Sequence, residues 1–109
     1  MKRRIADSAE VSVEFPEKVY YGSFTRHSTY DVKADEHGVH IELERSAGER
    51  RHVGVHIHYH LLADVLAAVG KSVAACKDLD EPTRDALEEA AAEMHKDLKK
   101  RPRRRKQKG

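Results

Sequence analysis

The sequence has little cysteine and few large aromatic residues: its 109 residues include one cysteine, two phenylalanines and no tryptophan. The single cysteine, Cys76, cannot form an internal disulfide, so a disulfide-stapled scaffold is excluded. With so few aromatic rings the core has to be mainly aliphatic, and a domain of this length buries only a modest core. We therefore expect one small domain with little room for a deep active-site cavity.

Long apolar runs are also missing. No stretch approaches the roughly 20 apolar residues of a membrane-spanning helix. The first four residues include three cations, but no apolar run follows them, so a signal peptide is not predicted. A soluble, cytoplasmic protein is the resulting expectation.

Motifs that would name a reaction are absent as well. The sequence contains no glycine-rich phosphate loop and no GxSxG, HExxH or CxxC pattern. Cys76 falls on the apolar stripe of a predicted helix, which is typical of a small core residue and not of a nucleophile. A non-enzymatic protein is therefore the leading prediction, and a small enzyme is an alternative to which no residue can be assigned.

Charge is plentiful but unevenly distributed. The net charge is +2, yet residues 5–98 hold 10 basic residues against all 19 acidic ones. The basic residues gather at the two ends of the chain. Such a division favours an acidic folded body with a functional basic tail over a uniformly basic binding surface.

Strands are predicted where β-forming residues occur and apolar residues alternate with polar ones. The segments are 11–15, 19–24, 30–34, 39–44 and 53–59. A tight turn is expected at 35–38, where Gly38 follows an aspartate. Apolar residues meet apolar partners if Val39 lies opposite Tyr59, or if the register shifts from this by two residues, whereas a shift of one would expose the core face. These segments predict a three-stranded antiparallel meander over about 30–59, which the earlier strands extend to four or five.

Helices are predicted after His60, where the apolar spacing changes to three and four. The first ends near Cys76, and the second begins at Asp80, the expected N-cap, with Pro82 in its first turn. The second helix has a narrow apolar stripe that suits packing on another helix, either within the chain or in a dimer. The stripe consists of Leu87, Ala90, Ala91, Met94 and Leu98.

Strands followed by helices predict an α+β fold: an antiparallel sheet of about four strands followed by two C-terminal helices. The expected organisation is a basic, flexible N-terminus at 1–8, a single α+β domain at 9–98, and a basic, disordered tail at 99–109.

Histidine is the most unusual component, with eight residues, four of them between positions 52 and 60. Alternate residues of a strand share a face, so His56 and His58 project together, and His60 joins them if the strand continues. In either register His40 lies opposite His56 or His58. Imidazole suits zinc, nickel and copper, so His40, His56, His58 and His60 form a candidate metal site. The alternatives are an ordinary wet sheet face, a pH-responsive surface or a face covered by a partner subunit.

The basic tail is the second unusual feature. Clustered cations neutralise phosphates and release counterions, which gives salt-dependent binding with little sequence preference. The tail has no aromatic residue, so base stacking is not its mode of binding. The candidate polyanion-binding residues are Lys99, Lys100, Arg101, Arg103, Arg104, Arg105, Lys106 and Lys108.

Two classes of function follow from these features. The leading hypothesis is a small interaction or regulatory protein. Its acidic body would dock on a protein partner or on itself as a dimer, and its tail would contact nucleic acid or an acidic protein surface. The alternative is a metal-binding protein that uses the histidine-rich sheet face for zinc or another transition metal. Without that site no cofactor is expected.

Overall fold

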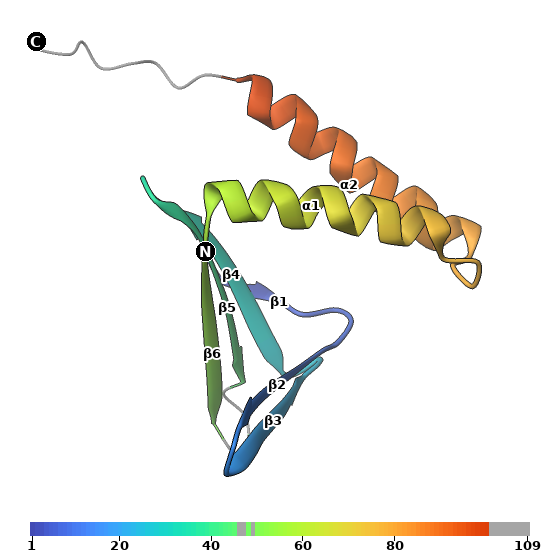
Figure 1. The fold of residues 1–109 in the computed structure, drawn as a ribbon. Coiled ribbons are helices and arrows are strands. Elements are labelled where there is room, and N and C mark those ends of the chain that lie inside the picture. Colours follow the sequence, from blue (N-terminus) through green and yellow to red (C-terminus); the bar gives the residue numbers. More distant parts are fainter. Residues whose placement is uncertain (46–47, 49, 101–109) are drawn as a thin grey trace, which may run out of the picture. The chain divides into compact units, whose positions relative to one another are not determined.

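A computed structural model describes residues 1–45, 48 and 50–100, which fold into strands followed by helices (Figure 1). In chain order the elements are β1 (Arg3–Arg4), β2 (Ala9–Phe15), β3 (Lys18–Phe24), β4 (Ser28–Ala34), β5 (Gly38–Arg45), β6 (Arg51–His58), α1 (Tyr59–Ala75) and α2 (Glu81–Lys99). The predicted α+β fold, with an antiparallel sheet of about four strands and two C-terminal helices, is confirmed.

The chain forms two compact units, and the boundary between them falls inside α1. The first unit is Met1–Ala68 and contains the strands and the beginning of α1. The second unit starts at Val69 and contains the rest of α1 together with α2. The proposed limits of a single domain at 9–98 stay a prediction.

The main sheet has the strand order β1-β4-β5-β6 and every neighbouring pair is antiparallel. Figure 1 shows β4, β5 and β6 side by side. Val39 lies opposite Ile57 and Ile41 lies opposite Val55, which is the predicted alternative shifted by two residues. Because the shift is even, the apolar residues still share one face of the sheet.

The expectation that segments 11–15 and 19–24 extend this sheet is wrong. They form β2 and β3, which pair with each other in a separate two-stranded sheet. Phe15 pairs with Lys18 across a loop of two residues, a length that favours a local hairpin. The fourth strand of the main sheet is β1, which pairs with β4, although no strand is predicted for residues 1–8.

The buried side chains lie on or next to three strands: Ile5 follows β1, Phe24 ends β3, and Ser28 and Asp31 lie on β4. Ile5 and Phe24 are the buried apolar side chains among the described residues, and Ser28 and Asp31 are buried polar ones. The backbone N–H of Ile5 donates to the carbonyl of Ser28 at 3.0 Å. The carboxylate of Asp31 accepts from the Met1 ammonium group at 2.9 Å, and this hydrogen bond lowers the pKa of Asp31. The core is therefore small and uses the N-terminal residues.

The helix α1 begins at Tyr59, directly after β6 ends at His58. The condition for His60 to join His56 and His58, that the strand continues to it, is not met, because His60 lies in the first turn of α1. No residue of α1 is buried.

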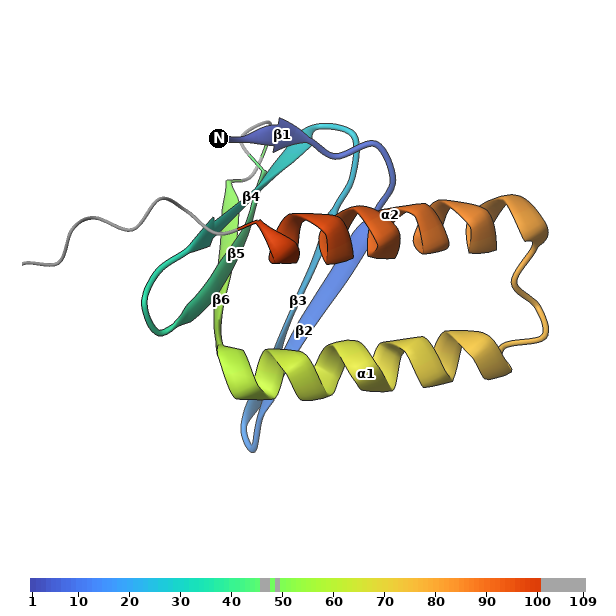
Figure 2. The same ribbon diagram turned by 90° about the horizontal axis from the view of Figure 1, so that it is seen from above.

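The predicted start of α2 is confirmed. The carboxylate of Asp80 accepts the backbone N–H of Thr83 at 2.9 Å, and hydrogen bonds to Thr83 lower the pKa of Asp80. In the second unit the Arg84 guanidinium donates to the carbonyl of Cys76 at 2.8 Å and holds the connection between the helices. The last part of α1 runs into this connection and α2 runs back from it, so the two segments are antiparallel (Figure 2).

Cys76 follows the end of α1 and is exposed, so its expected place in a core is wrong. No residue of α2 is buried, as in α1. Neither helix of the described chain is apolar over a stretch long enough to cross a membrane.

Glycine at position 38 is required by the close approach of β5 and β6. A Cβ atom there would overlap the carbonyl oxygen of Ile57 and lie 2.8 Å from the Cα of His58. We expect Gly38→Ala to lower the free energy of unfolding by about 1–3 kcal/mol, the usual cost of overpacking. Urea denaturation followed by circular dichroism measures this change.

Gly70→Ala is the matched control, because a Cβ at Gly70 in α1 meets nothing within 4 Å. Alanine favours the helix over glycine by roughly 1 kcal/mol, so this variant should be at least as stable as the parent. Equal effects of the two substitutions would contradict the packing described for Gly38.

Candidate functional site

Three histidine rings meet on one face of the main sheet. His40 on β5 lies directly opposite His56 on β6, and their ring centroids are 4.3 Å apart. His58 follows two residues after His56 on the same face, with a centroid distance of 5.1 Å. Of the two predicted partners of His40, His56 and His58, the one directly opposite is His56. His60 does not belong to this group, because it lies on α1.

The turn between β4 and β5 adds two residues that the sequence analysis did not include. Asp35 Oδ2 lies 3.5 Å from His56 Nε2, and the His37 ring stacks on that of His58 with centroids 6.3 Å apart. We call His37, His40, His56 and His58, together with Asp35, the histidine face. The predicted turn at 35–38 could have revealed Asp35 and His37. Either expected register brings the end of this turn, Gly38, close to His58 on the neighbouring strand.

Asp35 holds this turn in place. Its Oδ1 accepts the backbone N–H groups of His37 at 2.8 Å and Gly38 at 2.9 Å. The hydroxyl of Tyr59, the first residue of α1, donates to the Asp35 carbonyl at 2.6 Å. The two backbone hydrogen bonds are the main reason that the pKa of Asp35 is lowered from 3.8, and His56 adds to the effect. The carboxylate is therefore the form that stabilises the turn.

The histidine face offers several imidazole nitrogens and one carboxylate to solvent. The His56 side chain is 31% exposed, so its ring is accessible from outside. Within residues 1–45, 48 and 50–100, no three His, Cys, Asp or Glu side chains are grouped so that they could hold a metal ion. The shortest ring contact is that of His40 with His56, and a metal bound there would have two protein ligands and complete its shell with water.

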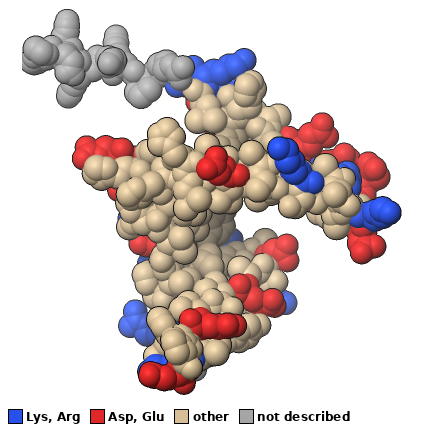
Figure 3. Space-filling model, viewed as in Figure 1, with Lys and Arg blue, Asp and Glu red and all other residues tan. Residues whose placement is uncertain are grey.

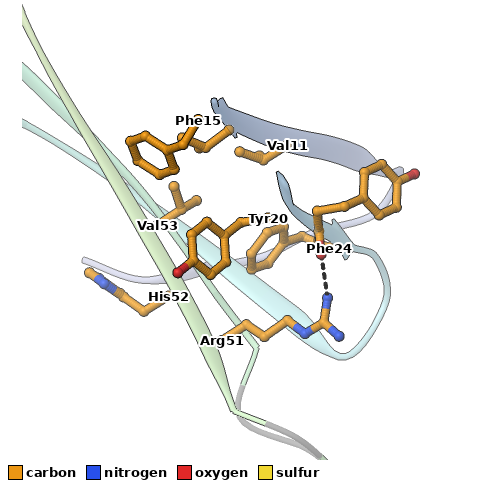
Figure 4. A pocket seen from close by; sticks show the side chains of 10 residues that line it. Val11, Phe15, Tyr20, Phe24, Arg51, His52 and Val53 are labelled. Atoms are coloured by element: carbon orange, nitrogen blue, oxygen red, sulfur yellow. Dashed lines mark hydrogen bonds between the residues drawn. The ribbon is translucent and has the colours of Figure 1, made fainter. Parts of the chain in front are cut away.

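An apolar groove of about 550 Å³ lies between the β2–β3 hairpin and the start of β6 (Figure 4). Phe15 and Tyr20 meet edge to face in it, with ring centroids 5.9 Å apart. At its edge the Arg51 guanidinium donates to the carbonyl of Tyr21 at 3.2 Å, which ties β6 to β3. The groove has no cluster of acids, bases or nucleophiles, and its chemistry is that of apolar contact.

Large apolar side chains are also exposed along both helices. On α1 Leu61 is 57% exposed and Val69 is 48% exposed. On α2 Leu87 is 45% exposed and Met94 is 39% exposed. Exposed apolar positions at helical spacing are typical of surfaces that another chain covers.

Of the predicted polyanion-binding residues, Lys99 and Lys100 lie within the described part of the chain. Lys99 is the last residue of α2, and Lys100 is its C-cap. The Lys100 ammonium group lies 3.2 Å from Asp97 Oδ1 and is largely exposed, so this ion pair is weak. The other six lie outside the described residues: Arg101, Arg103, Arg104, Arg105, Lys106 and Lys108.

Comparison of the chain with protein-family models, with curated proteins and with solved structures gave no match.

The role of Asp35 can be tested through pH. We expect Asp35→Ala to be less stable than the parent at pH 7, because the hydrogen bonds of Asp35 to His37 and Gly38 are lost. The folded pKa of Asp35 is lowered, so its contribution is complete above the ordinary value of 3.8 and is lost as pH falls through the folded value. The stability difference between parent and variant should therefore shrink below about pH 4.

Urea titrations of both proteins between pH 7 and pH 2 measure this difference. A difference that stays constant over the whole range would show that the charge of Asp35 does not stabilise the turn.

Proposed function

We propose that this chain is a small, non-enzymatic interaction protein. Its acidic body docks on a protein partner or on a second copy of itself, and its basic C-terminal segment contacts nucleic acid or another polyanion. The cytoplasm is the proposed location. The observation that carries the proposal is the set of large apolar side chains that α1 and α2 leave exposed.

Stability is the physical reason for expecting a docking partner. Helices in proteins are stabilised mostly by packing an apolar face and less by intrinsic helix propensity. The helices α1 and α2 have 17 and 19 residues, and neither contains a buried one. A partner that covers these apolar side chains would supply the missing packing.

Charge supports the second part of the proposal. All 19 acidic residues lie within residues 5–98, and eight cations follow from Lys99 onward. Because the cations are concentrated in a short segment, phosphates can be neutralised there without bringing the polyanion against the acidic body.

Binding to nucleic acid tests the tail. Full-length protein should bind single- and double-stranded nucleic acid, and a shortened chain ending at Leu98 should not. If most of the eight cations contact phosphates, affinity should fall by roughly 10³–10⁵ between about 50 and 200 mM salt. Fluorescence anisotropy with labelled oligonucleotides measures both effects.

The matched control replaces Arg103, Arg104 and Arg105 with glutamine, which keeps the chain length and removes three charges. Its salt dependence should be weaker than that of the parent. Binding that is unchanged in the shortened chain would refute the role of the tail, and absence of binding by the full chain would do the same.

Metal binding by the histidine face is the second candidate function. It is favoured by the distance of 4.3 Å between the His40 and His56 rings on directly opposed strand positions. Two imidazoles on neighbouring strands can chelate nickel, copper or zinc, and the nearby Asp35 carboxylate would orient His56.

Calorimetric titration with zinc or nickel tests this candidate. We expect one ion per chain, with affinity reduced at least about tenfold in His56→Ala, because losing one of two chelating ligands costs at least as much affinity as losing a group that only orients a ligand, which is roughly 10–100-fold. His27→Ala is the control, since His27 lies in the turn between β3 and β4, away from the histidine face. Equal affinities of the two variants would exclude the site.

A further inference from the structure

We propose that α2 pairs in antiparallel orientation with α2 of a second copy of this chain, through Leu87, Ala91, Met94 and Leu98. We call these four residues the α2 seam. The inference rests on the proposed docking function and identifies its partner. It depends on three properties of α2: the spacing of the seam, the register that this spacing allows and the charge along the helix.

The α2 seam has the spacing of paired helices. Its residues are separated by four, three and four positions, which is the alternation of a and d positions in a heptad. Leu87 and Met94 are both exposed by more than a third of their surface, and Ala91 is exposed as well. The preceding position of the same stripe is Arg84, which donates to the Cys76 carbonyl. The seam available to a partner therefore begins at Leu87.

An antiparallel arrangement matches the seam to itself. If Leu87 of one chain lies opposite Leu98 of the second copy, then Ala91 lies opposite Met94 of that copy, and both pairs occur twice by symmetry. In antiparallel coiled coils an a position packs against a d position, and this register satisfies that requirement at every layer. The small Ala91 faces the long Met94, which lets the layer close without a void.

Charge favours the same orientation. Residues 81–90 carry four carboxylates and one guanidinium group, whereas residues 91–100 carry three ammonium groups and two carboxylates. Figure 3 shows blue side chains near the end of α2 where the grey tail begins, and red side chains with several blue ones among them toward the other end of the helix. Antiparallel pairing puts the acidic half of each helix beside the basic half of its partner, whereas parallel pairing puts acidic beside acidic.

The residues that flank the seam agree with this charge pattern. On one flank of the α2 seam, Glu88 of one chain comes close to His95 of the second copy, so two carboxylates do not meet there. On the other flank Ala90 has a side chain small enough for the helices to approach closely. A second copy therefore supplies both the apolar surface and the complementary charge that the α2 seam requires.

Sedimentation velocity on the full chain over a range of concentrations tests the pairing. We expect a reversible dimer for the parent protein and at least a tenfold higher dissociation constant for Met94→Asp, which places a charge in the seam. The control is Ala92→Asp, which adds the same charge to the same exposed helix outside the seam and should dimerise like the parent. Circular dichroism checks that both variants retain their helices.

A second experiment tests the orientation. In a Cys76→Ser background, chains carrying Leu87→Cys are mixed with chains carrying Leu98→Cys and oxidised. Antiparallel pairing predicts a disulfide between the two different variants and none within either variant alone, because two copies of position 87 would lie about 16 Å apart along the helix axis. Disulfides within each variant alone would establish parallel pairing and overturn the proposal.

The outcomes separate this inference from the proposed function. A parent protein that stays monomeric at all concentrations, or a Met94→Asp variant that dimerises as tightly as the parent, overturns the pairing through the α2 seam. Nucleic-acid binding that depends on the tail in the same monomer leaves the proposed function standing. A dimer that binds no nucleic acid would leave the pairing through the α2 seam standing and would refute the role of the tail.

Discussion

The register between β5 and β6 is the constraint on which the rest of the first unit depends. Side chains of a strand alternate between faces, so one register decides both what is buried and what is displayed. With Ile41 opposite Val55, the apolar residues share one face, and His40 and His56 necessarily meet on the other. The backbone contact at Gly38 fixes the end of the pairing, because a side chain there would collide with β6. The histidine face is thus a direct consequence of how the sheet is paired.

Few apolar side chains are buried in the described chain, and this limits the free energy that apolar burial contributes to its folding. Hydrophobic residues make up 39% of the sequence, yet Ile5 and Phe24 are the buried ones among those described. Burial of apolar surface is the main favourable contribution to folding, and a small domain has little stability to lose. Exposed leucines, valines and a methionine on both helices therefore identify α1 and α2 as the parts of the molecule with most to gain from association.

The fold class and most element limits could be predicted from the sequence because they depend on local patterns. Alternation predicted β4, β5 and β6, and Asp80 with Pro82 predicted the start of α2. The choice of partner for β2 and β3 could not be predicted in this way, because alternation says which face is apolar and not which strand lies alongside. The two-residue strand β1 is too short to produce any pattern at all.

The candidate site was predictable where it depends on strand periodicity and not where it depends on tertiary contacts. Strand periodicity placed His40 opposite His56 or His58 and left open whether His60 joins them, since periodicity cannot locate the residue at which a strand becomes a helix. The structure puts that change at Tyr59, whose hydroxyl bonds to the turn that holds Asp35. Asp35 and His37 join the histidine face through this turn, and contacts of that kind depend on tertiary structure.

Salt acts differently on the two proposed activities of the C-terminal region. The proposed phosphate binding by the tail would be driven by counterion release and would weaken steeply as salt rises. Pairing through the α2 seam combines screened surface charges with apolar contacts, and only the charges are weakened by salt. Antiparallel pairing also sends the two tails from opposite ends of the paired helices, so that one dimer can engage a long polyanion at two places and gain avidity from their linkage. Dimerisation and polyanion binding should consequently reinforce each other at low salt, and at high salt the dimer should persist after the polyanion has dissociated.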